Sequence, residues 1–345
     1  MLWLGLFLIA LRKGRDIKRK SILIDVRSPK EYLQSHIPFA LNFPVLDDEQ
    51  HQEIGTLYRD SAFLAKKRGS AYICQNIAQF LGDDLVFHPQ NKLFLYCARG
   101  GQRSKSLWLI LREIGFDCER MEGGYKAYRQ RVLNALAVPT AHRFFTLYGM
   151  TGCGKSELIK KAQSWSIDLE GMSGHYGSSF GDQANGFRGQ PRQVMFENLL
   201  FESLQNQTEV LLVEGESKKL GKIVIPDPFF GQIHSGTRIL LKAAMQTRVE
   251  RIVKLYSQID EKNFFLCLEK IRPYMQKNFF EEVLLSWDKR DYEQIALILL
   301  EKYYDRVYCQ KTYDFEVDSN DLDLAYQEIC EFRDLGKFCL SSNKV

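Results

Sequence analysis

A phosphate-binding loop is the sequence feature that most restricts how this chain folds. Residues 149–156 read GMTGCGKS and fit the pattern G-x-x-x-x-G-K-S/T. An apolar run at 144–148 precedes the loop and a helical pattern at 157–161 follows it, the context that the pattern requires. Backbone N–H groups and the helix N-terminus in such a loop bind polyphosphates, unless the loop is only a glycine-rich turn that caps a helix. The expected polyphosphate site consists of Gly149, Thr151, Gly152, Gly154, Lys155 and Ser156, with Ser156 as the candidate Mg²⁺ ligand.

The composition is that of an ordinary globular protein, with 45% hydrophobic and 26% charged residues among 345. This length predicts about two domains. No apolar run reaches the length of roughly 18 residues that would predict a membrane-spanning helix. The eight cysteines show no C-x-x-C spacing and no pairing rhythm. Together with a nucleotide-type loop, this cysteine pattern favours the reducing cytoplasm.

Positive charge is concentrated in the N-terminal part of the chain. Residues 1–141 carry 21 Lys and Arg against 14 Asp and Glu, and the remainder carries 26 against 29. A basic half favours a polyanionic partner such as RNA, although a solvated charged face is equally consistent with charge alone. Farther along, Arg248, Arg251 and Lys254 share one helical face. We expect them either to meet nucleic-acid phosphates or to be solvated.

Strand and helix patterns alternate along the chain, which predicts parallel α/β sheets. Segment 137–141 (AVPTA) is the best candidate for a linker. We therefore predict one domain over 1–136 and a second over 137–345, whose part from about 245 to 304 is mostly helical. The expected strands are 21–27, 92–96, 144–148, 167–169, 210–213 and 238–241, and the expected helices of the first half are 71–82, 103–115 and 125–136.

A second loop places a cysteine between a strand and a helix. Cys97 directly follows the strand at 92–96, and the helix at 103–115 follows the loop. Backbone N–H groups in this position bind anions and favour a thiolate, and Arg99 and Arg103 add positive charge. The pattern predicts a sulfur nucleophile beside an anion site, with Cys97, Arg99 and Arg103 as candidate catalytic residues. The structural alternative is a small buried residue at a strand end.

Acidic residues end a strand in the second half. The apolar run 210–213 is followed by Glu214, and Glu216 lies two residues beyond it. An acid at this place can hold a metal-bound water or orient a substrate. Glu214 and Glu216 are therefore candidate ligand-binding residues, and an acid that caps the next helix is the alternative reading.

Four separated landmarks make most of residues 20–135 resemble a rhodanese domain. They occur in order as IDVRSPKEY at 24–32, HIPFALN at 36–42, the loop after Cys97, and EGGY at 122–125. In that family the loop cysteine carries sulfur or selenium as a persulfide-type adduct. The Cys-x5-Arg spacing from Cys97 to Arg103 is one residue longer than in common sulfurtransferases. This longer loop admits a larger anion, such as phosphate or selenophosphate, and it also resembles the loop of cysteine phosphatases.

The pairing of a rhodanese-like half with a phosphate-loop half resembles the tRNA 2-selenouridine synthase family over nearly the whole chain. The resemblance implies an N-terminal rhodanese-like parallel-sheet domain and a C-terminal P-loop NTPase-like α/β domain with a helical C-terminal part. One departure is the segment 171–176, where Tyr176 stands at a position expected to hold arginine. Further landmarks are GTLY at 55–58, GSSFG at 177–181, QVMFE at 193–197 and VEGES at 213–217.

The resemblance also implies a function. Members of this family convert the wobble 2-thiouridine (U34) of tRNA to 2-selenouridine through S-geranyl-2-thiouridine, with geranyl diphosphate and selenophosphate as co-substrates. It implies that loop 149–156 holds a diphosphate rather than ATP, with Mg²⁺ as a possible assistant. It also implies that Cys97 accepts selenium from selenophosphate as a selenosulfide and delivers it. The implied partner is tRNA, in the cytoplasm.

Two other readings stay open. A rhodanese-fold cysteine phosphatase fused to a nucleotide-binding, kinase-like domain is permitted by the Cys-x5-Arg loop. Against it, Tyr96 stands where those phosphatases usually place histidine, and no general acid is evident. A non-catalytic adaptor switched by phosphate binding is the third reading, and the presence of Cys97 argues against it.

Overall fold

The computed structural model describes residues 21–82, 87–182, 186–205, 208–215, 217–256, 258–308 and 312–341. The chain forms two compact units. The first comprises Met1–Ala135 together with Glu197–Gln205, and the second comprises Leu136–Phe196 and Asn206–Val345. Across the described residues, no helix combines the length and apolar character needed to cross a membrane.

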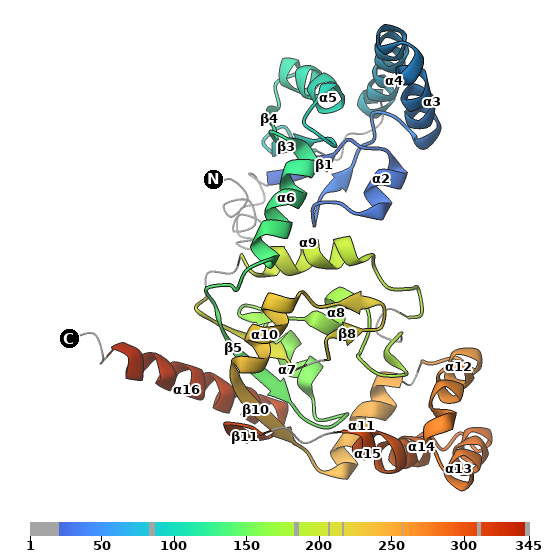
Figure 1. The fold of residues 1–345 in the computed structure, drawn as a ribbon, viewed down its shortest axis with the longest axis vertical. Helices are drawn as coiled ribbons and strands as arrows, with labels where there is room; N and C mark the ends of the chain where they lie inside the picture. Colours follow the sequence, from blue (N-terminus) through green and yellow to red (C-terminus); the bar gives the residue numbers. More distant parts are fainter. Residues whose placement is uncertain are drawn as a thin grey trace. The chain divides into compact units, whose positions relative to one another are not determined.

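A four-stranded parallel sheet forms the centre of the first unit (Figure 1). Its strand order is β2-β1-β3-β4, so the chain leaves β1 toward one side of the sheet and later continues on the other. This reversal places a crevice at the carboxyl ends of β1 and β3. The strands are β1 (Ser21–Asp25), β2 (Leu41–Asn42), β3 (Lys92–Tyr96) and β4 (Asp117–Arg120).

Helices of the first unit pack their apolar faces on this sheet or on one another. Ile73 and Ile77 of one helix and Leu107 and Leu111 of another join the buried core with Leu93 of β3. The helices α3 and α4 pack against each other as an antiparallel pair (Figure 1). The helices are α2 (Pro29–Gln34), α3 (Asp48–Asp60), α4 (Ala62–Gly82), α5 (Gln102–Glu113) and α6 (Gly124–Leu136).

The second unit is built on a five-stranded parallel sheet of order β11-β10-β5-β7-β6. The first strand of the unit, β5, is central, and β7 and β10 flank it. The expectation of α/β units with parallel sheets, a P-loop-type second part and a mostly helical stretch after it is confirmed. The strands are β5 (Arg143–Tyr148), β6 (Ser166–Ile167), β7 (Val210–Glu214), β10 (Thr237–Lys242) and β11 (Phe315–Asp318), and β8 (Lys219–Leu220) and β9 (Ile223–Val224) form a separate antiparallel hairpin.

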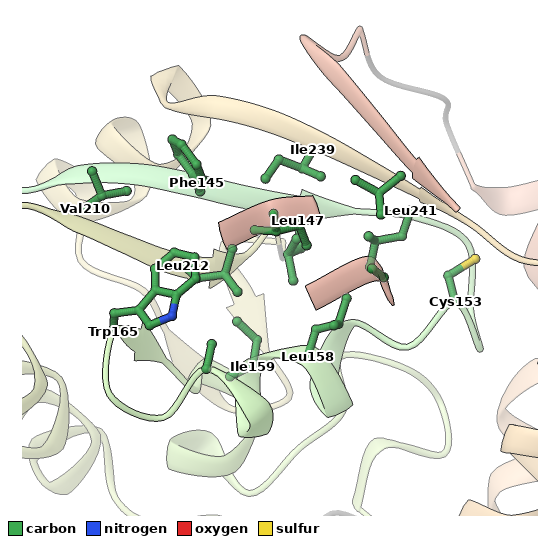
Figure 2. Close-up of a cluster of buried hydrophobic side chains, with 14 residues drawn as sticks. Phe145, Leu147, Cys153, Leu158, Ile159, Trp165, Val210, Leu212, Ile239 and Leu241 are labelled. Atoms are coloured by element: carbon green, nitrogen blue, oxygen red, sulfur yellow. The ribbon is translucent and has the colours of Figure 1, made fainter. Parts of the chain in front are cut away.

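One core joins this sheet to the helix that follows the phosphate loop. Figure 2 shows Leu147 and Leu212 of the sheet together with Leu158 and Ile159 of α7, with Trp165 at one end of the cluster. This packing fixes the start of α7, and therefore the loop before it, to the carboxyl edge of β5. The helices of this part of the unit are α7 (Lys155–Lys161), α8 (Leu169–Ser173), α10 (Asp227–Ser235) and α16 (Leu322–Ser341), and α9 (Gln193–Ser203) belongs to the first unit from Glu197 onward.

A helical part of the second unit has a core of its own. Phe180 from the sheet side packs with Phe264, Leu268 and Val283 in this second cluster. The turn Leu300–Tyr304 is a π-helix, a rare form that appears mostly at functional sites. The elements are α11 (Met245–Tyr256), α12 (Glu261–Ile271), η3 (Arg272–Tyr274), α13 (Lys277–Asp288), α14 (Tyr292–Leu299), η4 (Leu300–Tyr304) and α15 (Asp305–Val307).

Candidate functional sites

Cys97 lies at the carboxyl end of β3, in the crevice where the strand order reverses. Its side chain is buried. The sulfur accepts a hydrogen bond from the Gly101 N–H at 3.2 Å, and the Ser104 hydroxyl lies 3.4 Å away. The helix α5 begins at Gln102, so the first N–H groups of that helix also face the loop.

The loop lowers the pKa of the Cys97 thiol. Burial alone raises this pKa because it disfavours the charged thiolate. Hydrogen bonds from Ser104 and from the Arg99 N–H, together with the positive charge of Arg103, oppose burial and outweigh it. The result is a buried sulfur with increased thiolate character, which is the state that acts as a nucleophile.

The first turn of α6 holds this loop from outside. The N–H groups of Tyr125 and Lys126 donate to the carbonyls of Cys97 and Ala98, each at 2.9 Å. Gly124 lies in the left-handed region at φ 56°, and a Cβ at this position would come within 2.2 Å of the Cys97 oxygen. A side chain is therefore excluded here both by conformation and by space.

The two arginines of the loop have different environments. Arg99 is exposed. Arg103 is half-buried and forms two hydrogen bonds with Glu31, at 2.6 and 3.2 Å. That ion pair lowers the pKa of Glu31 against the effect of burial, which raises it. Arg103 thus keeps a neutralising partner beside the loop, which its sequence position did not reveal.

The phosphate loop lies between β5 and α7 and borders a pocket of about 480 Å³. The six predicted residues of the loop all line this pocket. Gly154, at φ 89°, is the N-cap of α7, so the positive end of the helix points into the loop. Lys155 donates to the Gly149 carbonyl at 3.0 Å, and its ammonium group therefore lies across the loop opening.

Two buried glutamates lie in one corner of the unit, and one of them contacts the end of the phosphate loop. The Ser156 hydroxyl donates a short hydrogen bond to Glu170, a residue that the sequence did not single out. Glu214, at the end of β7, accepts from the N–H of Leu169 at 3.2 Å. Glu170 follows Leu169 directly, so both carboxylates belong to the same corner of the unit. Glu216 lies outside the described residues.

The donor set of this corner suits a hard cation. A hydroxyl and carboxylates are the oxygen ligands that Mg²⁺ takes, along with phosphate oxygens and water. The described part of the chain contains no cluster of three or more His, Cys, Asp or Glu that could hold a metal by itself. Ser156 and Glu170, which line the pocket of the phosphate loop, therefore fit an ion that is shared with a bound polyphosphate, and Glu214 lies next to them through its contact with Leu169.

The expectation for Arg248 is wrong, because this side chain is buried and reaches neither solvent nor RNA, whereas Arg251 is half-buried and lines the pocket of the phosphate loop. Arg248 is buried, donates to the Thr151 carbonyl at 2.8 Å and forms a bidentate pair with Asp305. Arg251 donates to the Gly152 carbonyl at 3.3 Å. Both arginines hold the phosphate loop from the side of α11, because that helix packs against the unit rather than standing free.

The fold and these two loops define a protein with a rhodanese-type unit and a P-loop unit. The family models agree: residues 10–131 match the rhodanese-like domain, and residues 142–270 match the tRNA 2-selenouridine synthase AAA domain. The chain belongs to the tRNA 2-selenouridine synthase family, as its similarity to whole members also shows.

Three such members illustrate the extent of the similarity. The tRNA 2-selenouridine synthase of Hydrogenovibrio crunogenus is 30% identical over 329 residues, which cover 85% of this chain and 90% of that protein. The synthase of Shewanella frigidimarina is 34% identical, with 70% and 68% covered. The synthase of Shewanella loihica is 33% identical, with 70% of this chain and 66% of that protein covered.

Proposed function

We propose that this protein converts the wobble 2-thiouridine of tRNA to 2-selenouridine in two steps. In the first step, geranyl diphosphate alkylates the sulfur, and diphosphate leaves. In the second step, the selenium of selenophosphate displaces geranyl thiolate from C2, and hydrolysis of the remaining P–Se bond releases phosphate. Family membership supports the overall conversion, and the presence of two different anion loops supports a division into two steps.

An apolar cavity beside the phosphate loop is the observation that carries the prenyl step. This cavity, of about 70 Å³, shares Thr151, Ile252, Tyr256 and Tyr304 with the larger pocket of the phosphate loop. Beyond them it is lined by apolar and aromatic side chains such as Phe180. A polyphosphate that carries a hydrocarbon tail fits this pairing, because the loop binds charge and the adjoining cavity removes apolar surface from water.

The tyrosine side chains at the mouth of the apolar cavity are compatible with a hydrocarbon tail. Burial raises the pKa of Tyr256 and of Tyr304 well above the usual tyrosine range. Both side chains therefore stay neutral at physiological pH and add no charge at the mouth of the cavity. A purine nucleotide would instead require polar groups for its base, and the lining of the apolar cavity offers few of them.

The residues of the phosphate loop would stabilise the leaving diphosphate. Lys155 and the N-terminus of α7 supply positive charge where negative charge develops as the C–O bond breaks. Ser156, Glu170 and Glu214 would hold Mg²⁺, and that ion would supply further charge stabilisation. The S-geranyl group then makes the sulfur a better leaving group in the second step.

Cys97 is the residue that we assign to the selenium step. Its sulfur combines a lowered pKa with a surrounding set of N–H groups, so it suits a reaction with an anionic selenium donor. Arg99 and Arg103 would add positive charge around that donor.

Mass analysis of nucleosides tests this proposal directly. The full chain is incubated with 2-thiouridine tRNA, geranyl diphosphate and selenophosphate, and the digested tRNA is analysed. Wild type should yield 2-selenouridine, Cys97→Ser should accumulate S-geranyl-2-thiouridine, and Lys155→Ala should lower formation of both products. The proposal fails if wild type forms neither product, or if it hydrolyses an aryl phosphate rapidly in a Cys97-dependent manner.

A further inference from the structure

A groove in the first unit begins where the Cys97 loop ends. It has a volume of about 440 Å³ and is lined by residues of α3, α4 and α5. Gln102 and Arg103, the first two residues of α5, form one end of it. Gly101, the residue directly before them, donates the hydrogen bond to the Cys97 sulfur. One end of the groove therefore lies beside the loop that carries Cys97.

The floor of the groove is apolar and contains small residues. Leu46, Ile54 and Ile73 supply apolar surface, and Ala65 and Gly69 leave space between α3 and α4. This floor resembles the site of an apolar group rather than a site for phosphate alone.

Packing within the chain does not explain why position 55 is occupied by glycine. It lies inside the helix α3, where glycine is less favourable than alanine. A Cβ at this position would have no atom within 4 Å, so no neighbour requires the absence of a side chain. The same position lines the groove, and a side chain there would fill it. Gly55 belongs to the GTLY segment at 55–58, whose role is not explained by either loop.

The rim of the groove has the chemistry of an RNA-binding surface. Lys66 and Lys105 are exposed, and neither forms an ion pair with a described residue. None of the lining residues is acidic. Tyr58, also of the GTLY segment, is 55% exposed and offers an aromatic face on which an unstacked base can stack.

We propose that this groove holds the S-prenylated wobble nucleotide while its C2 atom lies at the Cys97 loop. The prenyl chain lies on the apolar floor, the nucleotide stacks on Tyr58, and neighbouring phosphates meet Lys66 and Lys105. This is a binding step in which no bond forms or breaks. The inference rests on the proposed function, because that function supplies an RNA whose base carries an apolar chain.

A groove-filling substitution tests the inference without removing any contact of the fold. Gly55→Leu introduces a better helix former into open space, so the protein should fold. Gly231→Leu is the matched control, because Gly231 is also an exposed glycine inside a helix, α10, with no atom within 4 Å of a Cβ, and it lines none of the pockets described above. Binding is measured with the full chain by fluorescence anisotropy on a labelled anticodon stem-loop RNA, with either S-geranyl-2-thiouridine or 2-thiouridine at the wobble position.

Wild type and Gly231→Leu should bind the geranylated RNA at least about tenfold more tightly than the 2-thiouridine RNA. Gly55→Leu should lose this preference and bind geranyl diphosphate normally. The combined substitutions Lys66→Ala and Lys105→Ala should weaken the binding of both RNAs equally and reduce the salt dependence of binding.

Retention of the full preference by Gly55→Leu overturns the inference, as does an equal loss in Gly231→Leu. A failure of the proposed function is seen separately. In that case wild type forms no S-geranyl nucleoside from geranyl diphosphate, whatever the binding experiment shows.

Discussion

The Cys97 loop and the phosphate loop have the same plan but different supports. Each follows a strand of a parallel sheet and precedes a helix whose N-terminus faces the loop. Backbone N–H groups of the first turn of α6 hold the Cys97 loop. Arginine side chains of α11, above all Arg248, hold the phosphate loop.

This difference corresponds to a difference in chemistry. A reactive sulfur needs fixed N–H groups close to it and few competing charges, and a backbone support supplies that arrangement. A site that only binds a multiply charged ligand tolerates long cationic side chains as supports. We therefore expect the Cys97 loop to be sensitive to small changes in backbone geometry and the phosphate loop to be sensitive to changes of charge.

The largest expected effect follows from substitution of Gly124. Gly124→Ala would force a Cβ to within 2.2 Å of the Cys97 oxygen, so the loop must move. We expect 2-selenouridine formation to fall by more than about 100-fold, with a loss of roughly 3 kcal/mol in stability. Gly115→Ala is the control, since Gly115 also has a positive φ, of 102°, but no atom within 4 Å of its Cβ. Comparable losses in both variants would show that conformational strain alone is responsible.

Arg248 tests the side-chain support of the phosphate loop. Arg248→Met removes the bond to Thr151 and leaves Asp305 without its bidentate partner. We expect a loss of about 3 kcal/mol in the free energy of unfolding and weaker binding of geranyl diphosphate. Chemical denaturation and calorimetry measure the two effects. Arg272→Ala, which breaks an exposed pair with Glu269, should change neither. Unaltered affinity in Arg248→Met would contradict a supporting role.

Glu202 tests the support of α6, because it accepts a hydrogen bond from Tyr128 at 2.9 Å. Burial raises the pKa of Glu202 to about 7. The unfolded state loses this proton at lower pH than the folded state, so stability is highest below the unfolded pKa and falls as pH rises to about 7. Glu202→Gln should therefore raise stability at pH 8 by about 1–2 kcal/mol and leave it nearly unchanged near pH 5. Melting curves across this range provide the measurement, and a constant difference at all pH values would exclude the assigned titration.

The smallest expected effect concerns Ser104. Its hydrogen bonds oppose the effect of burial on the pKa of Cys97, so Ser104→Ala should raise that pKa. The rate of Cys97 alkylation by iodoacetamide should then rise at higher pH than in wild type, with the protein otherwise unchanged. The Cys97→Ser variant supplies the background from exposed Cys74. An identical pH profile in wild type and Ser104→Ala would show that the Ser104 hydroxyl does not lower the pKa of Cys97.

The features that the sequence predicted are those encoded by neighbouring residues. Both loops could be found because strand, glycines and helix follow one another within a short segment. The contact of Arg103 with Glu31 spans 72 positions and could not be found in this way. The contact of Glu170 with Ser156 could not be predicted, because it depends on how the chain after β6 brings α8 next to α7. For Arg248, the helical spacing correctly indicated a shared face but did not show that this face is packed.

The first unit is formed by two separate segments of the chain, and this has a consequence for folding during synthesis. Tyr128 of α6 is fully buried, and its partner Glu202 belongs to the segment Glu197–Gln205. During synthesis at roughly 5–20 residues per second, this segment emerges about 3–13 s after α6. The core of the N-terminal unit therefore remains incomplete until the ribosome has translated the phosphate loop and the segment Glu197–Gln205. A nascent or recombinant fragment that ends near residue 136 would expose an aromatic surface and would be a poor substitute for the intact protein.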